Sequence, residues 1–395
     1  MLKYSKLFHK GGNDSDVYED RIVPTSEQRK FLISCKNKVR EHLRSRIRRA
    51  TKEELGMDRV VEPRFRTQGS WAYNTCIIPE RMPTQEMDWD FGVYLPVTVW
   101  EENGPPHAMA KAYFDLVEYA LGDLCAQENW QLLFGKDTCI RIQVANWAHL
   151  DIPLYAAPED EFEKVRERVD LAEACAELMR KSEALMDTVD FDFAMNQIQE
   201  QQWEDLDHVV MATRSGEWKA SDPEVIANWF RDRIEEHGEQ LRRVCRYLKG
   251  WRDFHWTSGG PTSVSIMIAA AQKFEPRPRR DDIALEETSR HLSQMFLSDI
   301  HEEGIDNGQE DFNRLSEEDR RLASTRFRTL ASTMQELRSI HETQKLDVIR
   351  QLRGQFGARI PNDISLIEVD AGADAIRNTA PLRVAPPVVL STKAG

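Results

Sequence analysis

The sequence predicts an α+β protein in which an N-terminal mixed sheet is joined to a larger helical part. Two observations support this. Short segments of alternating apolar and polar residues lie in the first 160 residues, and apolar residues spaced three or four positions apart dominate afterwards. At 395 residues the chain exceeds one ordinary small domain. We expect 1–160 to hold the sheet core with an N-terminal helix, 161–378 to form a helical lobe completing a cleft, and 379–395 to be a flexible tail.

The first element is a long helix, predicted from Ser26 to about Ala50. One apolar stripe recurs every fourth position, and Ser26 is expected to cap the helix. Four arginines near its end are interpreted as a solvated face, because charge runs usually have that role. The stripe consists of Phe31, Cys35, Val39, Leu43 and Ile47, and the arginines are Arg44, Arg46, Arg48 and Arg49.

Three segments are predicted to be strands. Asp88–Leu95 is apolar after its first residues and is expected to end at Pro96. A helix from Ala108 to about Gln127 follows. Thr138–Val144 then alternates as a half-buried strand does, and His149–Tyr155 is a further strand with one carboxylate among apolar residues.

The helical part begins at about Glu161. Phe162–Met179 is the first candidate helix, and Asp222-Pro223 opens the next, since aspartate caps helices and proline suits the first turn. Helices are also predicted around Leu241–Trp251 and Thr262–Ala271, with further polar helices from about Ile283 to Arg353.

Composition excludes several classes of protein. The formal net charge of −14 argues against a protein that coats nucleic acid, whose surface is normally basic. No stretch approaches the ~20 apolar residues needed to span a bilayer, and the N-terminus lacks the apolar core of a signal peptide. The six cysteines form no CxxC pair. We therefore expect a reduced, cytoplasmic protein with no membrane partner and no obligatory nucleic acid.

Three aspartates are the central candidate site. Asp88 and Asp90 would project from the same face of a strand, where two carboxylates repel each other unless a cation lies between them. Mg²⁺ prefers such oxygen ligands together with substrate phosphates. With Asp151 from a later strand, three carboxylates can hold two divalent ions that stabilise an in-line phosphoryl displacement. An Asp-X-Asp pair alone is more often a solvated turn or a cap.

A turn upstream strengthens the functional interpretation. Gln68-Gly69-Ser70 offers backbone that a phosphate can approach closely, free amide donors and a hydroxyl. The turn and the carboxylates together predict nucleotide chemistry with metal ions.

Other candidates are ambiguous from residue type alone. Lys249 suits phosphate oxygens, as does Ser263 after a Gly-Gly-Pro turn, but an exposed lysine near a helix C-terminus is the commoner role. Ser221 beside Asp222-Pro223 is more often part of a helix start. Tyr73 can stack on a base or simply pack, and Arg141 can bind phosphate or lie on the wet face of a strand.

The blocks around these residues resemble those of a known family. Gln68-Gly69-Ser70, Asp88–Pro96 and His149–Tyr155 are similar to the active-site blocks of bacterial cGAS/DncV-like nucleotidyltransferases. The Gly-Ser and Asp-X-Asp pattern is shared by many polymerase-β-like transferases, and later blocks make the resemblance more specific. Those blocks resemble the DncV-type dinucleotide cyclases and are Trp218–Pro223, Arg246–Asp253 and Gly259–Ser263, followed by Phe356–Pro361.

The resemblance implies a polymerase-β-like core beside a helical lobe. It implies synthesis of a cyclic dinucleotide, by analogy 3′,3′-cyclic GMP-AMP, from ATP and GTP in bacterial anti-phage (CBASS) signalling, although family members with other products exist. Two Mg²⁺ ions are expected on Asp88, Asp90 and Asp151. The implied nucleotide contacts are Gln68 and Ser70 to donor phosphates, Lys249 and Ser263 to the triphosphate, Tyr73 to a base, and Gly69, Arg141 and Ser221 to the nucleotides.

Related systems also imply a protein partner. There, a ubiquitin-transfer-like protein joins the cyclase through its C-terminal residue to a target, and this chain ends in Lys393-Ala394-Gly395. An ordinary frayed terminus explains the same residues equally well. Two other functions stay open at this point: a transferase that makes linear oligonucleotides or modifies RNA or protein, and a catalytically silent nucleotide sensor.

Overall fold

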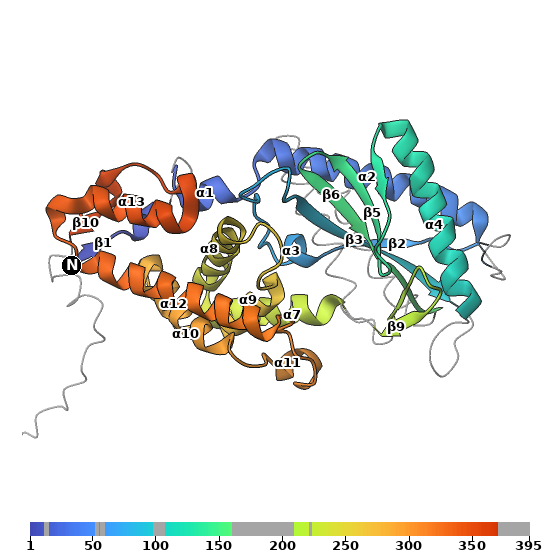
Figure 1. Cartoon of the computed structure of the whole chain (residues 1–395). Helices are drawn as coiled ribbons and strands as arrows, with labels where there is room; N and C mark the ends of the chain where they lie inside the picture. Colours follow the sequence, from blue (N-terminus) through green and yellow to red (C-terminus); the bar gives the residue numbers. More distant parts are fainter. Residues whose placement is uncertain are drawn as a thin grey trace, which may run out of the picture.

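A sheet with its helices and a bundle of helices make up the protein, as predicted (Figure 1). The structure, a computed structural model, describes residues 1–11, 16–51, 55, 60–97, 107–159, 209–220 and 223–369. The predicted helix at 162–179, Ser221 and the tail from 379 to Gly395 lie outside them.

The long strand β3 (Met87–Val97) organises an eight-stranded sheet in the described part of the chain. Strand β2 (Arg64–Gln68) pairs with it antiparallel along one edge. Strands β6 (Ala148–Ile152) and β7 (Leu154–Pro158) run parallel to it along the other edge. Beyond them lie β5 (Ile140–Ala145), β4 (Gln131–Leu133), β8 (Val210–Ala212) and β9 (Trp218–Ala220), all in antiparallel pairs.

Two prolines shape this sheet. Pro153 separates β6 from β7, yet both keep one register on β3, and the Pro153 carbonyl accepts a hydrogen bond from the Val93 amide at 3.0 Å. The strand predicted at 149–155 is therefore divided into two strands that follow one line along β3. The break is at Pro153, because proline has no N–H to donate to the sheet. The prediction that Pro96 ends β3 was wrong. Pairing with β2 stops at Tyr94, so no ladder bond is lost on that edge.

Two helices cover the sheet. Helix α2 (Ser26–Ala50) has the predicted bounds, and α4 (His107–Glu128) packs beside it. The cap of α2 is Thr25 rather than Ser26: the Thr25 hydroxyl accepts from the Gln28 amide at 3.2 Å, and the Gln28 side chain accepts from the Thr25 amide. The predicted stripe is buried except for Phe31, which is 38% exposed and lies against Trp147.

The helical lobe has a core of its own. Two of its helices, α8 and α9, face the sheet across the site described below. Its helices are α7 (Pro223–His237), α8 (Glu239–His255), α9 (Ser263–Ala271), α10 (Asp281–Met295), α11 (Glu303–Asp306), α12 (Glu317–Ser339) and α13 (Lys345–Phe356).

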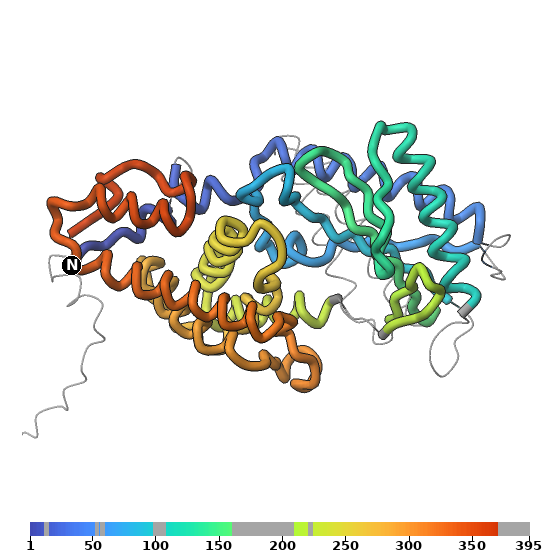
Figure 2. The backbone as a smooth tube through the Cα atoms, in the orientation of Figure 1, coloured from blue at the N-terminus to red at the C-terminus, as the bar shows by residue number. Residues whose placement is uncertain are grey.

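The N-terminal residues pack with the helical lobe, not with the sheet. Strand β1 (Leu2–Lys3) pairs with β10 (Glu368–Val369), so the two ends of the described chain lie side by side far from the sheet (Figure 2). Helix α1 (Tyr18–Ile22) contacts α8. This packing differs from the predicted division, which placed all of 1–160 with the sheet.

The cysteines within the described residues are buried and free; Cys175 lies outside them. Among the described helices, none is both long and apolar enough to cross a membrane.

Candidate active site

A cavity of about 670 Å³ lies between the sheet and helices α8 and α9. It gathers every predicted site residue except Ser221, which lies outside the described part of the chain. Those lining it are Gln68, Gly69, Ser70, Tyr73, Asp88, Asp90, Arg141, Asp151, Lys249 and Ser263. Residues nearly 200 positions apart in the chain thus meet at one cleft.

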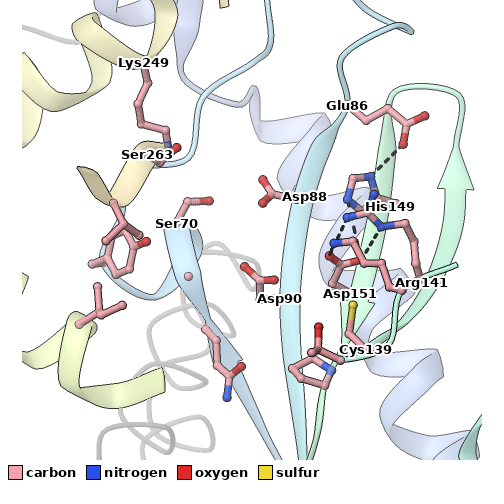
Figure 3. Close-up of a pocket in the computed structure, with 18 of the residues that line it drawn as sticks. Ser70, Glu86, Asp88, Asp90, Cys139, Arg141, His149, Asp151, Lys249 and Ser263 are labelled. Carbon is pink, nitrogen blue, oxygen red and sulfur yellow. Dashed lines mark hydrogen bonds and ion pairs between the residues drawn. The ribbon is translucent and has the colours of Figure 1, made fainter. Parts of the chain in front are cut away.

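Asp88 and Asp90 extend from β3 toward Ser70 (Figure 3). The stacked rings of Trp71 and Trp89, 4.1 Å apart, support this strand from behind, and the Trp71 indole N–H donates to the Asp88 carbonyl at 2.8 Å. Burial and the negative charges of Asp88 and Asp151 raise the pKa of Asp90 to about 7. The pair therefore carries negative charge that nearby cations do not fully balance.

The Gly-Ser turn lies directly against this pair. Gly69 has a φ of +60°, and a Cβ atom at this position would lie 2.1 Å from Asp90 Oδ2. Only glycine fits such close contact in this backbone conformation. The buried Ser70 accepts the Thr75 amide at 2.7 Å and the Cys76 amide at 3.1 Å through its carbonyl, which fixes the turn.

The Gln68 side chain is held at the floor of the cavity. Its amide donates to the Tyr94 hydroxyl at 2.7 Å and accepts from the Tyr155 hydroxyl at 3.2 Å. The two tyrosine rings stack at 4.7 Å. Gly92 leaves room for this arrangement, because a Cβ there would lie 2.5 Å from the Gln68 nitrogen. In this structure Gln68 thus anchors the strand that leads into the turn.

Asp151 lies opposite Asp90 on the neighbouring strand but has different neighbours. Arg141 contacts both of its carboxylate oxygens, at 2.6 and 2.7 Å (Figure 3). Lys136 donates to Oδ2 at 2.7 Å. Burial raises the pKa of Asp151, but the hydrogen bonds from Arg141 and Lys136 outweigh it and hold the pKa below its usual value.

The donor set fits a divalent cation in part. Asp88 and Asp90 offer oxygen ligands and unbalanced negative charge, which suits Mg²⁺ bound together with substrate phosphates. Among the described residues, however, no group of three or more His, Cys, Asp or Glu side chains is placed to hold a metal ion. Asp151 is engaged by Arg141 and Lys136, so it would have to exchange those partners to join the other two.

The opposite wall carries two cations, Lys249 and Arg252, and one carboxylate, Asp253, which accepts hydrogen bonds from Arg252 at 2.7 and 2.9 Å. Lys249 on α8 is buried, and its Nζ donates to the Thr75 carbonyl at 2.7 Å. Burial lowers the pKa of Lys249. The commoner role considered for this lysine, an exposed helix end, was therefore wrong. Ser263 begins α9, and its hydroxyl accepts from Arg252 at 3.0 Å.

Tyr73 lies at the edge of this wall. Its ring is buried and meets the ring of Phe230 edge-on, with the centroids 5.6 Å apart. The ring therefore packs within the protein while still lining the cavity.

Sequence reasoning missed several residues of the cavity. Glu86 accepts from Gln143 at 2.6 Å and bonds His149 Nδ1 at 2.8 Å, which places the imidazole beside Asp151. Lys136 precedes its strand in a loop and carries no sequence signal. Arg252 lies in a block already noted for its resemblance, so that block could have indicated it.

Carboxylates beside a Gly-Ser turn, facing cations across a cleft between sheet and helices, define a nucleotidyltransferase site. Residues 63–155 match the family model of the DncV-like cyclic GMP-AMP synthase nucleotidyltransferase domain, and residues 238–369 match that of the cyclic GMP-AMP synthase C-terminal domain. A cyclic GMP-AMP synthase of Escherichia coli strain TW11681 is 30% identical over 311 residues, 76% of this chain and 69% of the relative. The chain belongs to the DncV-like nucleotidyltransferases.

The chain is also similar to a protein of Vibrio cholerae, in both sequence and fold. Its cyclic GMP-AMP synthase is 35% identical over 212 residues, 53% of this chain and 47% of the relative. The solved structure of Vibrio cholerae DncV cyclic AMP-GMP synthase with the linear intermediate 5′ pppA(3′,5′)pG has a TM-score of 0.71 and 23% identity, and covers 93% of this chain and 99% of that one. This likeness confirms the predicted fold.

Proposed function

We propose that this protein synthesises a cyclic dinucleotide, 3′,3′-cyclic GMP-AMP, from ATP and GTP. The proposal rests on one observation: the carboxylates and the Gly-Ser turn lie on one side of the cavity, and two cations lie on the other side. Asp88, Asp90 and the Gly-Ser turn lie on the sheet side, and Lys249 and Arg252 lie on the helical side. A triphosphate needs cationic groups along its length, and its reacting phosphate needs charge neutralisation. The names of the relatives support the choice of product.

In the first step, the 3′-hydroxyl oxygen of one nucleotide attacks the α-phosphorus of the other. A 3′-oxygen–phosphorus bond forms, the bond to the β-phosphate oxygen breaks, and pyrophosphate leaves with the electron pair. The hydroxyl proton passes to solvent. Lys249, Ser263 and Arg252 bind and orient the triphosphate, while the glycine turn lets its phosphates approach the backbone. The linear intermediate bound to the Vibrio cholerae relative supports this order of events.

In the second step, the linear intermediate re-enters the same cavity and its free 3′-hydroxyl closes the ring, releasing a second pyrophosphate. Two Mg²⁺ ions, held by Asp88 and Asp90 and joined by Asp151, would supply charge neutralisation and lower the pKa of the attacking hydroxyl. Both steps use one site, so no covalent enzyme intermediate is needed.

The assay uses the purified protein with Mg²⁺ and all four ribonucleoside triphosphates, followed by mass analysis with and without phosphatase. We expect a product with the mass of cyclic GMP-AMP that phosphatase leaves unchanged. A phosphatase-sensitive product would instead identify a linear oligonucleotide synthase. Absence of any pyrophosphate release would identify a nucleotide sensor, and both results would reject the proposal.

The double variant Asp88→Asn, Asp90→Asn tests the assigned residues. It should fold and make no product. The matched control is Asp115→Asn, which removes an exposed carboxylate paired with Lys111 on α4 and should leave the activity unchanged. Full activity in the double variant would refute the assignment.

The resemblance also supports a proposed setting. We propose that the product is a second messenger of anti-phage defence, made in the cytoplasm where ATP and GTP are abundant. Phage infection of cells carrying the wild-type protein or the double variant tests this, and equal plaque counts would reject it. We further propose a ubiquitin-transfer-like partner acting at Gly395. Deleting that residue should abolish covalent conjugates in cells, and unchanged conjugates would reject the partner.

A further inference from the structure

The helical lobe contains a second cavity, of about 710 Å³, far from the first in the fold. The N-terminal segment, the loop before α10 and strand β10 line it. Strands β1 and β10 lie at the end of the lobe away from the sheet (Figure 1). The two cavities share no lining residue among those described. The second cavity therefore has no part in the proposed nucleotidyl transfer.

The lining of this cavity is basic, although the chain as a whole has a net charge of −14. Lys3, Lys6, Lys10 and Arg279 contribute to it, against the carboxylates of Asp281 and Glu368. In addition, His9 lies at the wall and bonds Glu19 at 2.7 Å. The cationic groups thus outnumber the carboxylates among the described lining residues.

Both carboxylates are already engaged. Glu368 forms ion pairs with Lys6 and, at 3.8 Å, with Lys3. Asp281 is fully enclosed, with its side chain 1% exposed, and accepts hydrogen bonds from Arg243 at 2.9 Å and from Tyr247 at 3.0 Å. Neither is therefore available to neutralise Arg279, which is exposed and forms no ion pair within the described part of the chain.

Hydrogen bonds hold the N-terminal segment, which forms one wall of this cavity, in place. The Ser5 hydroxyl accepts the Asp281 amide at 2.8 Å, which joins the N-terminal segment to the start of α10. The neighbouring Tyr4 hydroxyl donates to the Met334 carbonyl at 2.5 Å. Because backbone contacts fix the segment that carries Lys3 and Lys6, these cations face the cavity from a defined position.

We propose that this cavity binds a small polyanion carrying two or more phosphate or carboxylate groups. Its cations come from two separate parts of the chain, the N-terminal segment and the loop before α10. A ligand with two or more anionic groups can contact cations from both parts at once. Charge-assisted hydrogen bonds of this kind are the strong ones in ligand sites.

The test is calorimetric titration of the full chain at low ionic strength without Mg²⁺. Citrate is the carboxylate probe and inorganic tripolyphosphate the phosphate probe. The variant Lys6→Gln, Arg279→Ala is compared with the control Lys273→Ala, Arg321→Ala, which removes two exposed cations of the same lobe. Tripolyphosphate bound in the active site is unaffected by either pair, so the difference between the variants reports on this cavity.

We expect the first variant to bind at least one probe about tenfold more weakly than the wild type, and the control to bind as the wild type does. The probe that loses affinity identifies the anionic group. Arg279→Ala alone, which breaks no ion pair, should show part of the loss, and Arg279→Lys should restore most of it. Equal binding by all proteins, or no binding of either probe by the wild type, would overturn the proposal.

Discussion

Asp90 and Asp151 lie opposite each other on adjacent parallel strands, yet their surroundings differ. Asp90 faces Asp88 and the glycine turn, and its pKa is raised to about 7. Asp151 is bonded by Arg141 and Lys136, and its pKa is held below the usual value. The strand register places the two carboxylates together, but the cations within reach decide which one carries unbalanced charge. That difference identifies Asp90 as the carboxylate in greater need of a metal ion.

The largest expected effect is on catalysis. Asp90→Asn keeps the shape of the side chain but removes the charge that would hold a metal ion. We expect the rate of product formation to fall by at least about a hundredfold, the scale on which altered metal sites lose activity. Steady-state release of pyrophosphate measures this, with Asp115→Asn as the control. A loss of less than about fivefold would show that Asp90 is not a metal ligand.

Asp151 should matter more for stability. Asp151→Asn leaves Arg141 and Lys136 without their shared carboxylate, and both are partly exposed, so solvent softens the loss. We expect the free energy of unfolding to fall by about 1–3 kcal/mol. Urea denaturation of the metal-free protein measures it. Asp90→Asn is the internal comparison, and an equal loss in both variants would contradict the difference between the two sites.

The next prediction concerns the stability of the protein when the glycine of the Gly-Ser turn is replaced. Gly69→Ala would place a methyl group 2.1 Å from the Asp90 carboxylate and strain a φ of +60°. We expect about 1–2 kcal/mol of lost stability together with reduced activity. Gly122→Ala on α4 is the matched control, because its nearest neighbour atom would lie 3.9 Å away. That control should be neutral or slightly stabilising. Similar losses in both variants would contradict the proposed contact.

The last prediction is a pH dependence of stability that has opposite signs at the two carboxylates. The folded-state pKa of Asp90, about 7, exceeds its ordinary value of 3.8, so its contribution is present at low pH and is lost as pH rises toward 7. The pKa of Asp151 is lowered, so its contribution is present above 3.8 and is lost as pH falls below that value.

Thermal unfolding of the metal-free wild type and of Asp90→Asn between pH 5 and pH 8 measures the first of these contributions. We expect the wild type to lose stability relative to the variant as pH rises, because only the wild type acquires the Asp90 charge. Parallel curves would show that Asp90 titrates as an exposed carboxylate does.

Only part of this site could be predicted from the sequence. Period-two spacing predicted that Asp88 and Asp90 share a face, and this depends only on local geometry. The meeting of Lys249 and Ser263 with the carboxylates depended on the resemblance, because no local pattern relates residues so far apart in the chain. The ion pairs of Asp151 could not be predicted, since they depend on the antiparallel pairing that sets Arg141 opposite it.

Three smaller differences between the predicted and the observed structure have physical reasons. Thr25 precedes the predicted cap and forms the reciprocal bonds with Gln28 that Ser26, one residue further in, does not make. Pro96 continues β3 because β2 ends before it, which is a matter of strand lengths and not of the residue itself. The docking of the N-terminus on the helical lobe follows from rings such as Phe8 and Tyr18 packing on Tyr247, a contact between distant segments.

The central claim, that this cavity joins and then cyclises two nucleotides, has one direct measurement. Purified protein, ATP, GTP and Mg²⁺ are incubated to completion, and released pyrophosphate is counted against nucleotide incorporated into product. Ring closure predicts one pyrophosphate for every nucleotide incorporated, with a product mass of one adenosine and one guanosine monophosphate joined without terminal phosphate. A ratio of one pyrophosphate for every two nucleotides, with a triphosphate retained on the product, would contradict it.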